Sequence, residues 1–500
     1  MKTLTIDPIT RLEGHGKILL HLDDQGVLAG AVLQVPELRG FEAFCLGRRA
    51  EEMPQITERI CGVCPEAHHL ASVRALDAAF GAVVPEAARL QRALFYNTHI
   101  FSDHLLHLVF LGGPDLFLPE DTPRAGRNVL GVLQAFPELG REVVGVRARA
   151  QKVIEMIGGR AIHPVFALPG GVARPLAADE LEVIRGHTQA MVGLAESLVA
   201  VFHERILSQA RFQALLCAPE AILPTHYMGL VDAACAPSFH EGDVRVVAPD
   251  GREVFRLDAA AALDRIAEHS EPWTYAKFPY LKEPGWTGFA AGPQSGVYRV
   301  GPLARLNVAD GMATPRAQAE FERFRDWFGA RPVHATFAYH WARLVEAVQA
   351  AEAAAELARD DGLTGADVRG KLGAPGEGVG VVEAARGTLF HHYRLDEQAL
   401  VAGVNLIVAT THNTAGIGLS VQHMAAAVVH EGADEVLLNR VEMAFRAYDP
   451  CLACATHFLP GQMPLEVEVR GPDGALVRRA SRAAPPALSV PAHPVKEVPS

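Results

Sequence analysis

A chain of 500 residues, 49% hydrophobic and 21% charged, can bury a substantial core, which excludes general disorder. Its net charge of −12, with no basic run, argues against nucleic-acid binding. The N-terminus shows no signal-peptide pattern, and the longest weakly charged stretch, Val401–Ser420, contains polar residues such as Asn405 and His412 that are costly in lipid. We therefore expect a cytoplasmic protein without a membrane span.

The N-terminal segment alternates apolar and polar residues over 3–36, with a turn at 23–26, and this predicts a small antiparallel sheet. Residues 7–15 are too polar and irregular to be strand, so they are expected to form a loop between two of its strands. Arg39–Glu42 is expected to open a short helix.

Helical periodicity then dominates, and small strands are expected around it. Helices are predicted at about 64–82, 86–112, 138–157, 177–216, 315–360 and 419–430, and strands at 240–257, 381–383, 404–408 and 465–479. The segment 271–302 is expected to be irregular but packed, and the Pro/Ala-rich end of the chain to be loose. The predicted fold class is α+β, mainly α, with a central bundle of long helices and small peripheral β-sheets.

Two Cys-x-x-Cys pairs lie near opposite ends of the chain, each followed by a histidine. This spacing lets two thiolates converge on one metal, and we expect the fold to unite both pairs around a redox centre. The residues are Cys61, Cys64 and His68 in the first pair, and Cys451, Cys454 and His457 in the second. The other three cysteines lack paired spacing and are expected to be core thiols.

Structural zinc is the main alternative for four thiolates. Zinc-ribbon pairs are separated by about 15–20 residues, whereas these pairs are separated by most of the chain. Zinc also gives no reason for the flanking Arg59, Gly62, Asp449 and Pro450. These flanks favour a redox metal.

The flanked pairs, Arg59–His68 and Asp449–His457, resemble the two cysteine signatures of the catalytic large subunit of nickel–iron hydrogenases. Other segments are similar to further elements of that family, and together the similarity reaches nearly from the N-terminus to His457. They are Asp7–His15, Arg39–Glu42, Gly159–Pro164, Val300–Asn307 and Arg386–Tyr393, of which the last two look most like the soluble, cofactor-reducing branch.

The resemblance implies a fold, an activity and a metal centre. All four thiolates would bind nickel, and Cys64 and Cys454 would also bridge to an iron that carries CO and cyanide. Arg386 and the Thr410 hydroxyl would donate to the cyanide ligands. The implied activity is reversible heterolytic cleavage of H2.

Proton transfer and the surroundings of the centre are implied in the same way. Glu13 matches the family's proton-transfer glutamate, with the Cys451 thiolate as donor, and His68 would hydrogen-bond to a bridging sulfur. A magnesium ion would be bound by Glu42, His457 and the carbonyl of Leu406.

Two positions depart from the family pattern. Ala385 precedes the late arginine and Ala409 precedes the hydroxyl residue, where the family usually has proline at the first and often at the second.

The family resemblance also implies processing. A maturation endopeptidase would remove 458–500 once nickel is loaded and leave 1–457 as a single catalytic domain. The competing interpretation keeps the hairpin at 465–479 as a stable element.

Electron transfer requires partners. No cysteine set remains for an iron–sulfur cluster, and no Gly-x-Gly-x-x-Gly fingerprint is present, so we expect an iron–sulfur small subunit. A diaphorase-type or other electron-transfer module would handle NAD(P), a flavin or a disulfide acceptor. Three other functions remain: a complex I quinone-module relative, which lacks the four cysteines; a hydrogen sensor, which typically lacks the C-terminal extension; and a zinc-stabilised structural protein.

Overall fold

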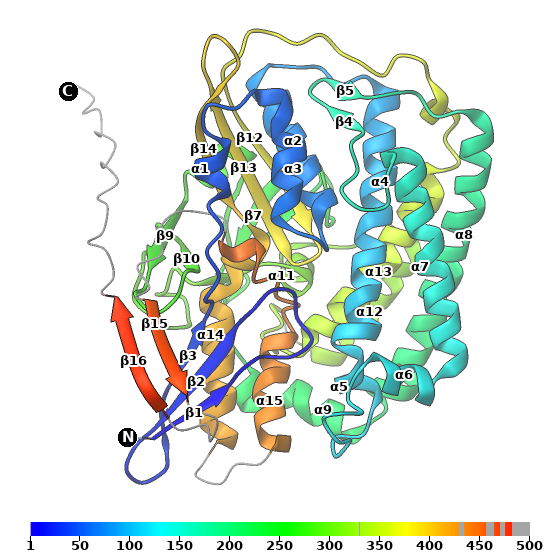
Figure 1. The fold of residues 1–500 in the computed structure, drawn as a ribbon. Helices are drawn as coiled ribbons and strands as arrows, with labels where there is room; N and C mark the ends of the chain where they lie inside the picture. The colour runs from blue at the N-terminus through cyan, green and yellow to red at the C-terminus, as the bar shows by residue number, and fades with distance from the viewer. Residues whose placement is uncertain (1, 330, 430–434, 457–464, 471–475, 483–500) are drawn as a thin grey trace.

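Four long helices form a bundle that makes up one side of the molecule, on the right in Figure 1. They are α4 (Glu86–Leu105), α7 (Pro137–Gly158), α8 (Ala178–Val201) and α13 (Ala338–Leu357). Helix α4 packs against α7 and α13, and α8 packs against the same two helices. The alanine-rich α13 is buried on nearly all sides, since small side chains let neighbouring helices approach closely. The computed structural model describes residues 2–329, 331–429, 435–456, 465–470 and 476–482.

Two of the predicted helices are interrupted. The prediction of one helix over 177–216 is wrong, because α8 ends at Val201 and a π-helical turn, Phe202–Leu207, separates it from α9 (Ala210–Cys217). Likewise α4 passes at Leu105 into a π-helical turn, Leu106–Leu111. A π turn changes the direction of the apolar face over a few residues, which a periodicity of 3.6 does not register.

Small sheets lie outside the bundle, as predicted. Strands β1 (Lys2–Ile6), β2 (Lys17–Leu22) and β3 (Leu28–Gln34) form the expected antiparallel N-terminal sheet. A second antiparallel sheet joins β12 (Glu377–Ala384), β13 (Gly387–Leu395) and β14 (Val401–Ile407). This second sheet packs on α3 (Pro65–Ala79), the helix that follows the first cysteine pair.

The middle of the chain contains more strand than the sequence indicated. The predicted hairpin at 240–257 is β7 (Asp243–Val247) and β8 (Glu253–Leu257), joined by β6 (His226–Val231) and β11 (Tyr298–Arg299) into one sheet. The segment expected to be irregular also supplies β10 (Lys277–Leu281), which pairs with β9 (Ile266–Ser270). Strand β6 is buried along its whole length and therefore shows no alternation of polar and apolar residues.

Helices α14 (Ala409–Val428) and α15 (Glu435–Arg446) pack together and lead to the second cysteine pair. The remaining elements of the described residues are mostly shorter. They are α1 (Phe41–Cys45), α2 (Met53–Thr57), α5 (Gly113–Phe117), α6 (Val129–Ala135), α10 (Ala259–Leu263), α11 (Pro302–Val308), α12 (Pro315–Phe328), β4 (Ala167–Leu168), β5 (Gly171–Val172) and five 3-10 turns. Of the helices in the described ranges, none is both long and apolar enough to cross a membrane.

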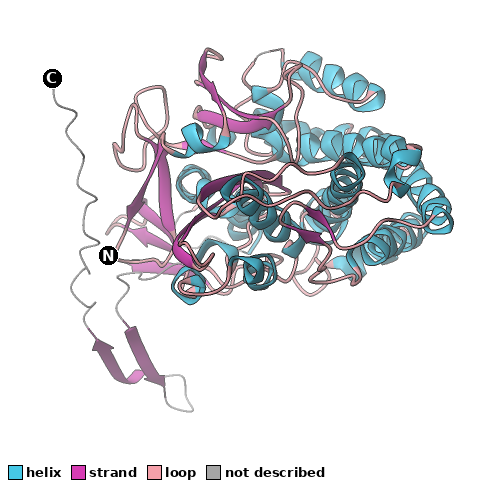
Figure 2. Ribbon diagram, turned by 90° about the horizontal axis from the view of Figure 1, so that it is seen from above, coloured by secondary structure: helices cyan, strands magenta, loops and turns pink. Residues whose placement is uncertain are grey.

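The predicted C-terminal hairpin is present. Strands β15 (Leu465–Arg470) and β16 (Leu476–Arg482) pair antiparallel and lie apart from the helical bundle in both views (Figures 1 and 2). The tail that we expected to be loose, beyond Arg482, is outside the described residues.

Candidate metal centre

The four paired cysteines meet in one buried cluster. Their sulfur atoms all lie within 4.8 Å of one another, although the two pairs come from opposite ends of the chain. The Cys61 and Cys451 sulfurs are 3.5 Å apart, and those of Cys64 and Cys454 are 3.7 Å apart. Four convergent thiolates, buried to at least 96%, are a donor set that fits nickel or another soft metal.

The first pair is shaped by the start of α3. Pro65 occupies the first position of that helix, where its missing N–H costs no hydrogen bond, and Cys64 is the residue before it. The backbone N–H groups of Val63 and Cys64 donate to the Cys61 sulfur at 3.2 and 3.1 Å. Burial opposes ionisation of Cys61, but contacts with the other three sulfurs outweigh it and lower its pKa well below the ordinary value. Burial, and then contacts with neighbouring sulfurs, raise the pKa of Cys451 and Cys454 well above the ordinary value, so Cys61 is the member of the cluster that favours the thiolate form, which binds metals.

The second pair is joined to the N-terminal loop through Glu13. The N–H of Leu452 donates to the Glu13 carbonyl at 2.8 Å, and the N–H of Ala453 donates to its Oε2 at 3.2 Å. The Cys451 thiol donates to the same Oε2 at 2.9 Å. Gly14 permits this approach, because it has a φ of 84° and a Cβ there would lie 2.6 Å from the Ala453 nitrogen.

The environment of Glu13 disfavours its charged form. Burial is the main cause that raises the Glu13 pKa, and the negative charge of Cys61 raises it further. The carboxyl group can therefore hold a proton beside the Cys451 sulfur at a higher pH than an exposed glutamate.

Arg386 occupies the tight turn between β12 and β13 and is 2% exposed. Its Nη1 donates to Asp103 at 2.9 Å, and its Nη2 donates to Asp449 at 3.2 Å. Burial tends to raise the Asp449 pKa, but Arg386 and then His107 more than offset this and hold it well below its usual range. The guanidinium is thus fixed as a charged group close to the cysteines.

Thr410 lies in the first turn of α14 and not in a strand. Its hydroxyl accepts the backbone N–H of Cys451 at 3.0 Å, so it stands beside the second cysteine pair. A hydroxyl that accepts a hydrogen bond still has its own hydrogen to donate.

His68 extends from α3 towards the β12–β14 sheet. Its Nδ1 lies 3.2 Å from Nε2 of His391, whose Nδ1 lies 2.9 Å from the Tyr393 hydroxyl. That hydroxyl is 3.0 Å from the Ser72 hydroxyl. This buried chain of hydrogen bonds was not predicted from the sequence. His391 and Tyr393 are two residues apart on one strand and therefore share a face, which could have suggested it.

Two of the three predicted magnesium ligands lie together. The backbone N–H of Leu406 donates to Oε1 of Glu42 at 2.8 Å, and burial raises the Glu42 pKa. His457 lies outside the described residues, but the carbonyl of the preceding Thr456 accepts the N–H of Arg39 at 2.8 Å.

Comparison with known proteins assigns the chain to a family whose metal agrees with this cluster of four cysteines. The family described as nickel-dependent hydrogenase matches residues 39–117 and 258–457, and one described as HoxL-like matches residues 3–38. The chain is 43% identical to an iron-sulfur subunit of the F420-non-reducing hydrogenase of Archaeoglobus profundus, over 96% of this chain and 99% of that protein. It is 37% identical to the beta subunit of the NAD-reducing hydrogenase HoxS of Cupriavidus necator, over 96% of this chain and 100% of that protein.

A solved structure shows the same fold. The crystal structure of an NAD+-reducing [NiFe]-hydrogenase in the H2-reduced state superposes with a TM-score of 0.85 at 38% identity, covering 91% of this chain and all of that chain. The predictions of family and fold are thereby confirmed. The protein belongs to the nickel-dependent hydrogenase family, as the catalytic large subunit of a nickel–iron hydrogenase.

Proposed function

We propose that this protein carries out reversible heterolytic cleavage of H2 and passes the electrons to a separate iron–sulfur subunit. The observation that carries the proposal is the convergence of four buried cysteine sulfurs within 4.8 Å, with the Glu13 carboxylate 2.9 Å from the Cys451 sulfur. Such a site combines a soft-metal donor set with an adjacent group that can hold a proton.

The four cysteine sulfurs would hold nickel, and Cys64 and Cys454 would also hold iron. When bound, the metal pair would supply the redox chemistry that polarises H2 and takes up its electrons. Arg386 and Thr410 would donate to cyanide ligands of the iron, which would also carry CO. The buried guanidinium, held by two carboxylates, supports this role because a desolvated site needs fixed donors for charged ligands.

Glu13 accepts the proton that H2 cleavage leaves at the Cys451 sulfur. Its Oε2 is oriented by the Ala453 N–H and faces the thiol directly. His68 would orient a bridging sulfur, supported by His391.

Magnesium would be held by Glu42, the Leu406 carbonyl and His457. In an antiparallel strand the N–H and C=O of one residue point to the same edge, so a Leu406 N–H that reaches Glu42 directs the Leu406 carbonyl to that side as well. Two side chains, one carbonyl and waters form a coordination set that magnesium accepts.

Electrons leave through an iron–sulfur small subunit, then reach a soluble acceptor such as NAD(P) through a diaphorase-type or other electron-transfer module, in the cytoplasm. Within the described residues, only the four-cysteine cluster groups three or more potential metal ligands. One relative is named as the beta subunit of an NAD-reducing enzyme, which supports this route.

Infrared spectroscopy with metal analysis tests the proposal, on protein purified with its native partners and maturation machinery. We expect bands of metal-bound CO and cyanide, and nickel and iron in equal amounts. Zinc alone with a silent spectrum, in fully processed protein, would contradict the proposal.

A further inference from the structure

Asp115, in α5, joins three segments that are far apart in the sequence. Its Oδ1 receives Nη2 of Arg11, from the N-terminal loop, at 2.6 Å. Its Oδ2 receives Nε of Arg446, the last residue of α15, at 2.8 Å. The side chains of Asp115, Arg11 and Arg446 are 4%, 11% and 1% exposed, so this bridge is almost closed to solvent.

The bridge holds the loop that carries Glu13. Arg11 lies two residues before Glu13, and its Nη1 also donates to the Leu111 carbonyl at the end of the π-helical turn. Thr10 donates its hydroxyl to Glu442 of α15 at 2.8 Å, and Arg446 contacts the same carboxylate. The loop is therefore attached to α5, to the π-helical turn and to α15.

The bridge also holds the segment that carries Cys451, five residues after Arg446. The chain segments 11–13 and 446–452 are linked at one end through Asp115 and at the other by the hydrogen bond from Leu452 to the Glu13 carbonyl. The Glu13 carboxylate and the Cys451 sulfur face each other across this closed ring. A shift at the Asp115 end therefore changes the separation of these two groups.

The backbone of the loop depends on these contacts. Arg11 has a φ of 59°, a left-handed conformation that a non-glycine residue adopts at a cost of about 1 kcal/mol or more. Such a conformation persists where surrounding contacts enforce it, and Asp115 and Leu111 supply two of them at the Arg11 side chain.

Asp115 is charged in this setting. Burial tends to raise its pKa, but Arg446 and Arg11 outweigh that effect and lower it to about 2. Burial and then the charge of Arg446 lower the Arg11 pKa, and the two cations, which repel each other, both contact the carboxylate between them. A neutral side chain of the same shape would remove the carboxylate that contacts both cations and leave Glu442 to offset less of the repulsion.

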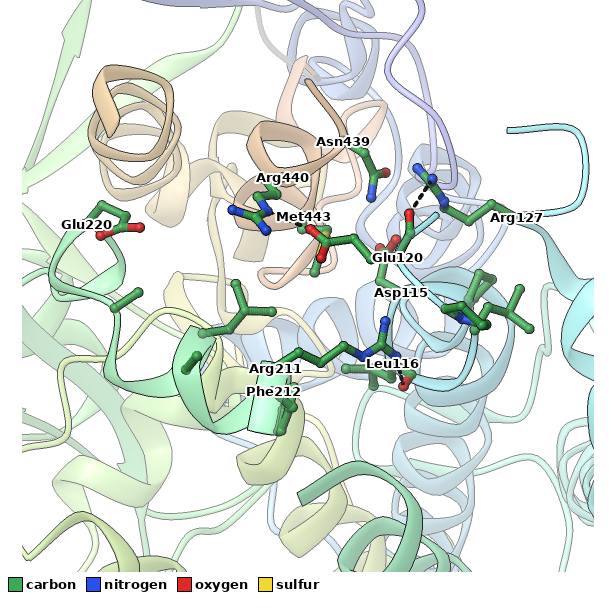
Figure 3. Close-up of a pocket in the computed structure, with 16 residues that line it drawn as sticks. Asp115, Leu116, Glu120, Arg127, Arg211, Phe212, Glu220, Asn439, Arg440 and Met443 are labelled. Carbon is green, nitrogen blue, oxygen red and sulfur yellow. Dashed lines mark hydrogen bonds and ion pairs between the residues drawn. The ribbon is translucent and has the colours of Figure 1, made fainter. Parts of the chain in front are cut away.

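Asp115 also borders a cavity of about 190 Å³ between α5, α9 and α15, which contains none of the four cysteines (Figure 3). Figure 3 shows Asp115 near Asn439 and Met443 of α15. Since Asn439 accepts from Arg446 at 2.7 Å, the cavity lies directly beside the bridge. The bridge therefore borders a cavity on one side, where its ionic contacts help to hold its geometry.

We propose that Asp115 is a positioning residue for proton transfer, which holds Arg11 and Arg446 so that Glu13 meets the Cys451 sulfur. The inference rests on the proposed role of Glu13. Because proton transfer is steep in distance, a displacement of about 1 Å is expected to slow it up to about 100-fold without removing either reacting group.

A double-mutant cycle tests this inference in the complex with its native partners. The variants are Asp115→Asn, Glu13→Gln and both together, with Asp77→Asn as a matched control, because Asp77 pairs with the buried Arg92 at 2.6 Å elsewhere in the fold. The measurements are nickel and iron content, H2/D2O exchange, and the infrared carboxyl band that disappears in Glu13→Gln. Asp115→Asn is expected to retain the metals, shift that band and slow exchange about tenfold or more, with little further loss when Glu13→Gln is already present.

The outcomes separate the two proposals. Unchanged H2/D2O exchange in Glu13→Gln would overturn the proposed proton acceptor. If exchange is impaired in Glu13→Gln, but Asp115→Asn shows an unchanged infrared carboxyl band and an unchanged exchange rate, only the positioning role is overturned. Additive losses would also overturn the positioning role. If Asp115→Asn fails to retain the metals, Arg11→Lys, which keeps the charge but not the geometry, is measured in the same way. Metal loss in that variant as well would assign the bridge to folding and contradict the inference.

Discussion

At the residue scale, one carboxylate oxygen of Glu13 faces both a backbone donor and a thiol. Oε2 accepts the Ala453 N–H and lies 2.9 Å from the Cys451 sulfur, in a site where burial raises the pKa of the carboxyl group. The same side chain therefore combines a fixed position with a proton affinity suited to transfer.

Replacing Glu13 with Gln keeps the shape of the side chain and removes its ability to carry a proton. We expect H2/D2O exchange to fall about 100- to 10,000-fold while nickel and iron content stay unchanged. Glu51→Gln, at a side chain that is 70% exposed, is the control and should have full activity. Wild-type exchange in Glu13→Gln would require another proton acceptor.

Glu58, three residues before Cys61, is a buried carboxylate, and neither of its oxygens has a hydrogen-bond partner among the described residues. Arg59 and His69 approach it only to 3.8 Å. Burial raises its pKa from 4.5 to about 8, and the nearby charge of Arg59 only partly opposes this.

This raised pKa predicts a pH-dependent stability. A carboxyl group whose folded-state pKa lies above its unfolded value contributes stability below about pH 4.5, and the contribution is lost as the pH rises towards about 8. The apparent Tm should therefore decrease from about pH 5 to about pH 9 more steeply in wild type than in Glu58→Gln. Parallel Tm profiles would show that Glu58 does not titrate in this range.

At the element scale, the position of the first cysteine pair depends on how closely α3 approaches β12. A Cβ at Gly380 would lie 2.3 Å from the Ala75 nitrogen and 2.4 Å from the Ala71 carbonyl oxygen, so only glycine fits between strand and helix. Since Cys64 immediately precedes α3 and His68 lies within it, this contact also places two residues of the metal centre.

Gly380→Ala is expected to lower stability by about 1–3 kcal/mol, because the helix must move away from the sheet. The apparent Tm and the nickel content should both decrease. Gly418→Ala is the matched control, since a Cβ there meets no atom within 4 Å and alanine is favoured in a helix by about 0.5–1 kcal/mol. Equal behaviour of the two variants would contradict the close-packing argument.

Helix α14 shows why some element boundaries could not be predicted. The helix predicted from the sequence begins at residue 419, whereas α14 begins at Ala409. Its first turns are buried and carry polar side chains that bond to other parts of the fold, such as Thr410 to Cys451 and Asn413 to Val300. A helix buried all round has no apolar stripe, so periodicity fails there.

At the scale of the whole molecule, the end of the described catalytic part lies against the start of α1. The Arg39 N–H donates to the Thr456 carbonyl, one residue before His457. The proposed cut after His457 would fall one residue beyond this contact, and residues 458–500 would be removed.

Mass spectrometry of the active complex is expected to give a large subunit that ends at His457. Cells grown without nickel are expected to accumulate the full-length chain, because processing follows metal insertion in this proposal. A stop codon placed after His457 provides the processed form directly as a size standard. Full activity in a chain that still ends at Ser500 would eliminate the cleavage proposal.

Local sequence patterns are sufficient to predict the two metal-binding cysteine pairs, the long helices and the N-terminal and C-terminal hairpins. Each of these is encoded in local spacing or periodicity, and Cys61 to Cys64 is a distance that the chain fixes over three residues. Family resemblance then identified Glu13, Arg386 and Thr410, all of which lie at or beside the site in the structure.

The groups that surround these residues are evident only from the folded structure. Asp103 accepts a hydrogen bond from Arg386, His391 contacts His68, and Asp115 joins Arg11 to Arg446. No local sequence motif predicts the role of Asp103, His391 or Asp115. These contacts join residues 104 to 331 positions apart. Their convergence depends on how helices and sheets pack, and packing is a property of the folded chain that local spacing does not encode.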